Sequence, residues 1–484
     1  MSVKKNFIYN SLLTLSNYIF PLIIFPYISR VLGVSNIGIC NFIDSIINLY
    51  ILFAMMGVST LGVREIAKSQ LSTDSNKKDS IFSSIFLLNI YSTVIILIIY
   101  LTSIYIIPEL NQHKDLMYIG GIKILFNLFL IEWFYKGIEN FRYITIRSII
   151  IKLLYVISIF MFVKETADYN IYYALSGSII VVNAIINWKY KSKFVHFTLK
   201  RLELRSFIKP FFSLGIYALL TSMYTTFNVI FLGFISGDKE VGYYTTATKL
   251  FGTILALFTA FTTVMLPRMS SLFSQNELEK IKILTIKSFD LLFMFCLPVI
   301  IISVILAPEI IEFIAGPGYE GAITPMRIVM PLVLVIGIAQ ILIIQMLMPL
   351  RKDKAILINS IIGATVGILL NILLVKEFNS TGSALVLLCA EISVLLSASF
   401  FVKKYLNIIV PLYKLLKNII VSSPYILICI LGLTIFISPI IIITFTLALS
   451  SIYFFISQIY VLKNEWAILT LKNIIRRCKL KSKE

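Results

Sequence analysis

The sequence predicts an all-α polytopic membrane protein with about 14 transmembrane helices. Apolar residues make up 58% of the 484 residues and charged residues only 14%, more apolar surface than a soluble core of this length needs. Apolar stretches of about 20 residues, long enough to cross the hydrocarbon core of a bilayer, recur along the whole chain. Little sequence remains between them for a soluble domain, so we expect the function to lie in the membrane.

The expected spans follow one another from one end of the chain to the other. They are predicted at residues 8–29, 37–58, 81–107, 116–135, 143–163, 170–188, 208–234, 241–266, 287–307, 323–348, 355–375, 382–402, 416–437 and 439–461. Lys4 and Lys5 precede the first span, as they would precede the apolar core of a signal peptide. Its apolar run is too long for one and lacks a small-residue cleavage pattern, so we interpret it as a span.

Lysine and arginine are concentrated in every second connection. With the N-terminus inside, the inner connections hold 34 of these residues and the outer ones hold five: Arg30, Lys114, Lys164, Lys239 and Lys376. Positive residues are retained on the cytoplasmic side, so both termini are expected in the cytoplasm. The net charge of +19 then reflects topology, with anionic phospholipids rather than nucleic acid as its natural partner.

The residues of common enzyme and metal sites are scarce. The five cysteines are dispersed without paired spacing, and the two histidines, His113 and His196, lie in connections on opposite faces. The sequence has no phosphate-cradling Gly-rich loop with a lysine and no spacing that favours a Ser-His-Asp arrangement. We therefore expect a transporter rather than an enzyme, with no metal and no cofactor.

The chain repeats itself with an offset of 204 residues. The segment 33–38 (GVSNIG) separates the first two spans, and 237–242 (GDKEVG) separates the seventh and eighth. The basic residues in the same register are Arg64 with Arg268, Lys123 with Arg327, and Arg147 with Arg351. Two parallel repeats of six spans are typical of transporters that rock two lobes about a central site.

This repeat predicts five segments. They are an N-terminal lobe (1–190), a basic cytoplasmic linker (191–207), a C-terminal lobe (208–405), two further spans (406–462) and a basic amphipathic cytoplasmic tail (463–484).

Ionisable residues inside spans are costly and usually face a cavity or the bundle interior. The candidates are Asp44, Lys123, Glu132, Lys152, Lys249, Asp290, Arg327 and Glu391. Lys123 and Lys249 lie about eight residues inside their spans, or about 12 Å of helix, so we expect them to line a cavity. Asp44 and Glu391 are candidates for coupling to protons or cations, the alternative being carboxyl groups that hold helices together.

Three arginines lie at membrane edges, where each could be an interfacial anchor or a guard of the passage. They are Arg30, Arg64 and Arg268. Guanidinium groups bind phosphate oxygens through two parallel hydrogen bonds, which suits an anionic, phospholipid-like substrate. With Lys123, Lys249 and Arg327 they form the predicted substrate-binding set.

Four segments carry a family resemblance. They are 25–33 (FPYISRVLG), 62–67 (GVREIA), 133–147 (WFYKGIENFRYITIR) and 241–250 (VGYYTTATKL). Together they resemble the polysaccharide transporter family, the Wzx-type O-antigen flippases of the multidrug/oligosaccharidyl-lipid/polysaccharide superfamily. The resemblance implies a bacterial inner-membrane protein that moves undecaprenyl-pyrophosphate-linked oligosaccharides from the cytoplasmic to the periplasmic face. It also implies a cationic cavity with alternating access, and polysaccharide polymerase or ligase machinery as partners.

One departure and two alternatives remain open. Such families often carry a charged residue early in the seventh span, where this chain has Asn228. A cation-coupled multidrug exporter would share the core of twelve spans, but it should concentrate acidic groups for a cationic drug. A membrane-bound O-antigen polymerase or ligase would need an enlarged outer loop, and the outer connections here, near 108–115 and 308–322, are short.

Overall fold

The structure, a computed structural model, describes residues 3–70, 75–200, 202–222 and 226–462. These residues are helical almost throughout, and no strand occurs among them. This confirms the predicted all-α class. The predicted amphipathic tail at 463–484 lies outside the described residues.

Twenty α-helices make up the described chain. In order they are α1 (Val3–Met55), α2 (Val58–Ser69), α3 (Ser75–Ile106), α4 (Pro108–Gln112), α5 (Lys114–Leu130), α6 (Glu132–Gly137), α7 (Phe141–Phe162), α8 (Tyr169–Lys191), α9 (Leu204–Ser222), α10 (Thr226–Ser236), α11 (Asp238–Ser274), α12 (Leu278–Ile305), α13 (Ala307–Ala315), α14 (Ile323–Val329), α15 (Leu332–Leu342), α16 (Asp353–Leu370), α17 (Lys376–Leu406), α18 (Leu412–Ser422), α19 (Pro424–Ile435) and α20 (Pro439–Ile456).

Eleven helical segments of the described chain are long and apolar enough to cross a membrane. The difference from the fourteen predicted spans has a physical origin. The span 8–29 and all but the last three residues of 37–58 lie in one continuous segment, Ile8–Met55. The spans 355–375 and 382–402 lie in another, Asp353–Leu406. The span 208–234 covers two shorter helices, α9 and α10.

A glycine breaks the longest helix. The 53 residues of α1 would extend about 80 Å if straight, far beyond the thickness of a bilayer. Gly33, with φ 75° and ψ 170°, interrupts it in a region that L-residues rarely adopt. Gly237, which is 204 residues further on and precedes α11, has nearly the same conformation, φ 81° and ψ 179°.

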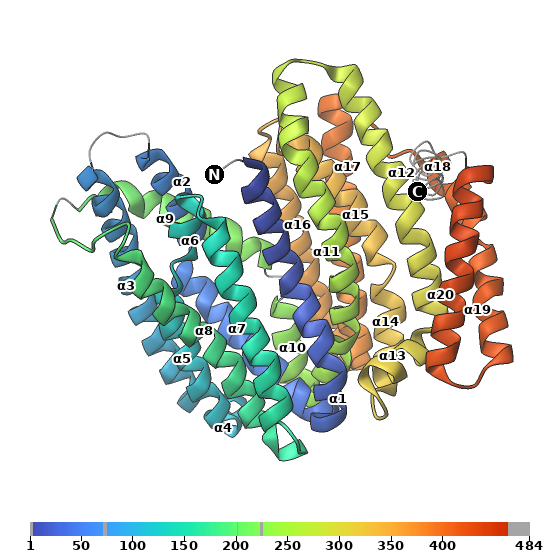
Figure 1. The fold of residues 1–484 in the computed structure, drawn as a ribbon, viewed down its shortest axis with the longest axis horizontal. Helices are drawn as coiled ribbons and strands as arrows, with labels where there is room; N and C mark the ends of the chain where they lie inside the picture. Colours follow the sequence, from blue (N-terminus) through green and yellow to red (C-terminus); the bar gives the residue numbers. More distant parts are fainter. Residues whose placement is uncertain (1–2, 71–74, 201, 223–225, 463–484) are drawn as a thin grey trace, which may run out of the picture.

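Two short helices lie at the same end of the molecule in Figure 1, α4 after α3 and α13 after α12. Each begins with a proline in its first turn, Pro108 and Pro308, where the missing N–H leaves no intrahelical bond unmade. The helices α2 and α6 lie at the opposite end. By the charge asymmetry, the end with α4 and α13 is the expected outer face, and the end with α2 and α6 is the expected inner face.

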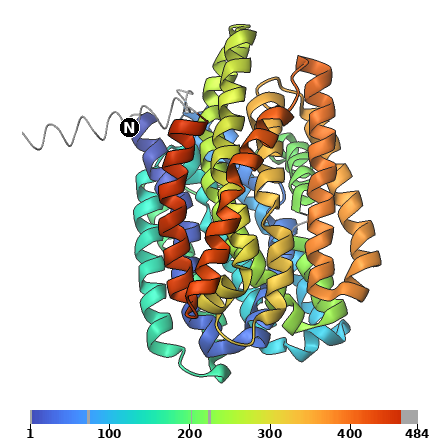
Figure 2. The same ribbon diagram turned by 90° about the vertical axis from the view of Figure 1, so that its right-hand side faces the viewer.

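The helices form two groups with α1 between them. Figure 1 shows α2–α8 on one side and α10–α17 on the other, with α19 and α20 at the far edge. The same bundle of long, roughly parallel helices is seen from its edge in Figure 2. α1 packs against α3, α5 and α7 of the first group and against α10 and α11 of the second. α19 and α20 pack on α12 and α13.

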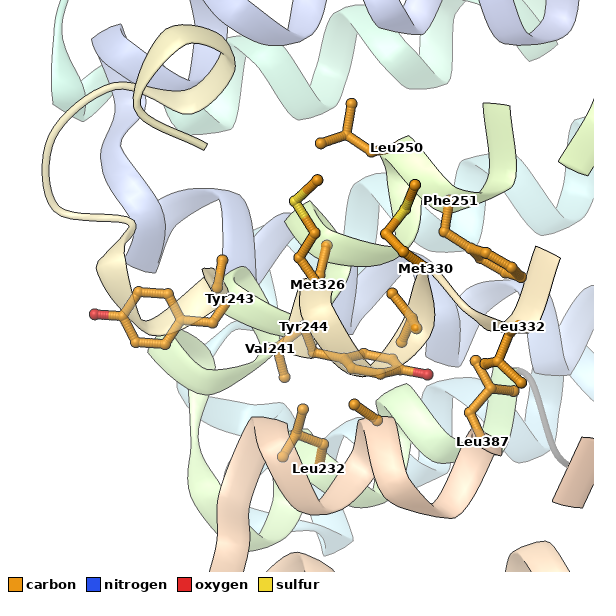
Figure 3. Packing of buried hydrophobic residues seen from close by; sticks show 14 of the residues in the cluster. Leu232, Val241, Tyr243, Tyr244, Leu250, Phe251, Met326, Met330, Leu332 and Leu387 are labelled. Atoms are coloured by element: carbon orange, nitrogen blue, oxygen red, sulfur yellow. The ribbon is translucent and has the colours of Figure 1, made fainter. Parts of the chain in front are cut away.

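Apolar side chains fill the second group. Figure 3 shows Tyr244 and Phe251 of α11 packed with Met326 and Met330 from the α14 region and with Leu387 of α17. On the outside, large apolar side chains are exposed along most of the long helices. Such a surface is suited to contact lipid rather than water.

Candidate functional site

An ion pair lies between α1 and α5. Lys123 donates from Nζ to Oδ1 of Asp44 over 2.8 Å and to the hydroxyl of Ser176 over 2.9 Å. The same ammonium lies 3.7 Å from the centre of the Tyr173 ring. Only 4% of the Lys123 side chain is exposed, against 45% of Asp44. The structure therefore brings two predicted residues together. The lysine is buried, and the carboxylate is partly exposed.

The second lysine of this region lies across α1. Lys249 projects from α11, and its ammonium is 4.4 Å from the centre of the Phe25 ring of α1. A cation over an aromatic face is stabilised by about 0.5–2 kcal/mol. Two lysines, on α5 and α11, thus flank α1, and the carboxylate of Asp44 on α1 pairs with Lys123. We call Asp44, Lys123 and Lys249 the central cluster.

Arg30 caps a helix. Its Nη1 donates to the carbonyls of Pro26 (2.7 Å) and Ile314 (3.3 Å), and its Nη2 donates to the carbonyl of Phe313. The last two carbonyls belong to the final turn of α13, where the helix dipole favours a cation. Next to it, Tyr319 donates to the carbonyl of Ser29 over 3.2 Å. Arg30 therefore joins α1 to the second helix group at the expected outer face.

The other predicted residues lie apart from one another. Arg64 lines a pocket at the opposite end, and Arg268 is exposed in the last two turns of α11. Arg327 donates to the carbonyl of Val304 over 3.2 Å. Glu391 is buried in α17, with 7% of its surface exposed, and makes no hydrogen bond or ion pair with any described residue.

Sequence reasoning missed several partners of these groups. Ser176 and Tyr173 hold Lys123 from α8, and neither lies in a charged motif that would single it out. Asn228, noted as a departure from the family pattern, is fully buried and donates to the hydroxyl of Tyr244 (3.0 Å) and the carbonyl of Ser383 (2.9 Å). At this position a neutral amide joins α10, α11 and α17.

The sequence places this fold in a family. Residues 3–273, more than half of the chain, match the family model described as polysaccharide biosynthesis protein. The chain belongs to this family. The resemblance drawn from the four sequence segments is thereby confirmed.

Two relatives of this chain carry the name "Putative O-antigen transporter". The one from Escherichia coli (strain K12) is 29% identical over 394 residues, which cover 81% of this chain and 94% of the relative. The one from Shigella dysenteriae is 27% identical over 403 residues, which cover 81% of this chain and 98% of the relative. Both are named as transporters and not as enzymes.

Solved structures share the fold. The lipid II flippase MurJ in an inward closed conformation superposes with a TM-score of 0.75 at 18% identity, over 92% of this chain and 98% of that one. An inward-facing multidrug resistance MATE family transporter of the MOP superfamily gives a TM-score of 0.63 at 14% identity, over 84% and 95%. At these identities the likeness extends to the fold alone.

Proposed function

We propose that this protein is a flippase for undecaprenyl-pyrophosphate-linked oligosaccharide repeat units, carrying them from the cytoplasmic to the periplasmic face of a bacterial inner membrane. The observation that carries the proposal is the central cluster: two lysines and one carboxylate between the helix groups of a polysaccharide biosynthesis protein. The sugars and pyrophosphate cannot cross hydrocarbon, whereas the polyprenyl tail can remain in lipid. Net positive charge at this depth offsets the desolvation of the anion.

The proposal includes two lobes related by the repeat, fourteen spans and both termini in the cytoplasm. A reciprocal contact between α1 and α11 supports the relation between the two lobes. A Cβ added at Gly38 would lie 1.8 Å from the carbonyl oxygen of Asp238, and one added at Gly242 would lie 2.3 Å from that of Val34. Each position is the other's equivalent under the 204-residue offset, as a pseudo-twofold axis requires.

We assign the coupling of flipping to a proton gradient to Asp44 and Glu391. Asp44 holds Lys123, so protonation of Asp44 would release the ammonium to an incoming phosphate. Glu391 is a buried carboxyl without a described partner, which makes its charge state sensitive to its surroundings. Neutral replacements, Asp44→Asn and Glu391→Gln, should then abolish the acceleration of flipping by a proton gradient. If both variants still respond to the gradient, neither group is the coupling site.

The function is tested in proteoliposomes with an undecaprenyl-pyrophosphate-linked oligosaccharide that carries a fluorophore on its glycan. External dithionite quenches the molecules that reach the outer leaflet. Lys123→Ala/Lys249→Ala should slow quenching at least tenfold, because both cations of the central cluster are lost. Lys114→Ala/Lys164→Ala, which removes two exposed lysines elsewhere, should stay within twofold. Parental protein that does not accelerate quenching over empty liposomes would refute the flippase.

The second candidate is export of cationic drugs, favoured by the fold shared with a multidrug transporter. The central cluster argues against it, because two lysines against one aspartate repel a cation. The same proteoliposomes loaded with ethidium decide between the two. Ethidium efflux without glycan flipping would favour the exporter.

A further inference from the structure

A pocket of about 580 Å³ lies at the expected inner end of the first helix group. It is formed where α1 passes into α2 and where α5 passes into α6. Its polar lining comes from Ser59, Thr60, Arg64, Asn127, Glu132 and Lys136. We call it the inner pocket, and the central cluster contributes none of its lining residues.

The polar groups of the inner pocket suit phosphate. Arg64 uses Nε to hold Glu65 at 2.8 Å, which leaves its two terminal Nη groups for a ligand. Burial alone would raise the pKa of Glu65, but hydrogen bonds from Lys68 and Arg64 outweigh it and lower this pKa, so the carboxylate stays ionised. A guanidinium fork and a lysine beside hydroxyl and amide donors form a set that binds phosphate oxygens.

The acidic residue in the lining, Glu132, is paired with a buried arginine outside the pocket lining. Oε1 of Glu132 accepts a hydrogen bond from Nη2 of Arg147 over 2.9 Å, and 4% of the Arg147 side chain is exposed. Asn187 and Ser148 hold the same guanidinium. Lys136 lies 3.6 Å from the other oxygen of Glu132. The buried arginine therefore balances the carboxylate, and the open side of the inner pocket keeps its positive charge.

One face of α5 carries residues of both the inner pocket and the central cluster. Lys123 of the cluster and Asn127 of the pocket are four residues apart and lie on the same side of the helix. Four residues correspond to about 6 Å along the axis. A phosphate group leaving the pocket would meet Lys123 within about one helical turn.

We propose that the inner pocket is the loading site for the phosphate groups of the lipid-linked substrate, held by Arg64 and Lys136 before transfer to the central cluster. This assignment rests on the proposed function and adds a separate binding site that the substrate occupies before it reaches the central cluster. The volume is typical of a small-molecule site, so it receives the headgroup, while the polyprenyl tail stays in lipid. Free phosphate and a lipid headgroup share this chemistry, and the experiment separates them.

The test follows a cysteine placed at Ser59, an exposed residue of the pocket lining, in a chain whose five native cysteines are replaced by alanine. Undecaprenyl pyrophosphate in detergent should slow maleimide labelling at least fivefold. Arg64→Gln/Lys136→Gln should abolish this protection, and Arg64→Lys should retain part of it. The control Lys189→Gln/Lys193→Gln removes two exposed cations outside the pocket and should keep the protection within twofold.

Two further labelling experiments, each with a different competing molecule, identify the ligand. Inorganic pyrophosphate should protect at higher concentration, because it carries the same anion without the lipid tail. Phosphatidylglycerol at the same concentration should not protect. Full protection in Arg64→Gln/Lys136→Gln, or equal protection by phosphatidylglycerol, would overturn the loading site. Flipping by parental protein is measured separately, so loss of this inference would leave the flippase standing, and Arg64-dependent protection without flipping would refute only the transport.

Discussion

At the scale of single residues, the partners of buried charges decide what each charge can do. Glu132 and Arg147 were both visible in the sequence, but their pairing was not predicted. It depends on Ile131, a β-branched residue in the left-handed region with φ 38°, which ends α5 and starts α6. Nothing in the local sequence signals that break, since β-branched residues rarely adopt this conformation. Asp44 and Lys123, 79 residues apart, were likewise predicted singly and not as a pair.

The role of Arg147 can be separated from that of a structural ion pair. Arg147→Gln leaves Glu132 charged beside the inner pocket, so protection of the Ser59 cysteine by undecaprenyl pyrophosphate should fall at least fivefold. Removing the buried Arg147 guanidinium should also destabilise the fold, because Glu132, Asn187 and Ser148 lose their shared partner. Adding Glu132→Gln removes the carboxylate that Arg147 no longer neutralises and should restore most of the protection. If the double variant shows as little protection as Arg147→Gln, Arg147 has a packing role only.

At the scale of helices, hydropathy and turn chemistry predicted much of the arrangement. Most residues of each predicted span fall on described helices. The last predicted span was expected to begin at residue 439, and Pro439 begins α20. The breaks within long helices were harder to predict. Asn379, with φ 51° and ψ −127°, interrupts α17 without a glycine or proline at that position.

Arg30 gives an element-scale prediction, because it caps α13 from α1. Arg30→Gln should free the last carbonyls of α13 and weaken the contact between α1 and the second helix group. Exposure at the expected outer face is followed through a cysteine at Ser29, which is 1% exposed. We expect an impermeant maleimide to label this cysteine at least threefold faster in the Arg30→Gln variant. Lys239→Gln, an exposed cation on the same face, is the control. Equal labelling rates would show that Arg30 does not seal this end.

At the scale of the whole molecule, the charge asymmetry and the repeat were the most informative signals in the sequence. The repeat was seen in a few glycines and basic residues, and the glycines carried more structural information than the charges. Gly33 and Gly237 share a backbone conformation, and Gly38 and Gly242 meet the opposite helix in reciprocal contacts. Among the basic residues, Lys123 pairs with Asp44, whereas its equivalent Arg327 donates to the carbonyl of Val304. Composition can locate charged residues in spans, but only packing determines which of them face one another.

The α1–α11 contact predicts a cross-link that stops transport. Asn41 donates to the hydroxyl of Thr245 over 3.0 Å, and the two residues are equivalent under the 204-residue offset. Under the proposed alternating access, these helices have to separate at the expected outer face, where α1 and α11 pack together. In a chain without native cysteines, a disulfide in Asn41→Cys/Thr245→Cys should reduce glycan flipping at least tenfold, and dithiothreitol should restore it.

A matched pair within one helix group provides the control for this cross-link. Ser397 of α17 donates to Asn359 of α16 over 2.6 Å, so Asn359→Cys/Ser397→Cys places a bond of the same kind where no separation is expected. Its oxidation should change flipping by less than twofold. Oxidation is quantified by mass spectrometry of the peptides in both variants. If the fully oxidised 41–245 pair flips glycan at the parental rate, the two helices move as one body and the transport path must open elsewhere.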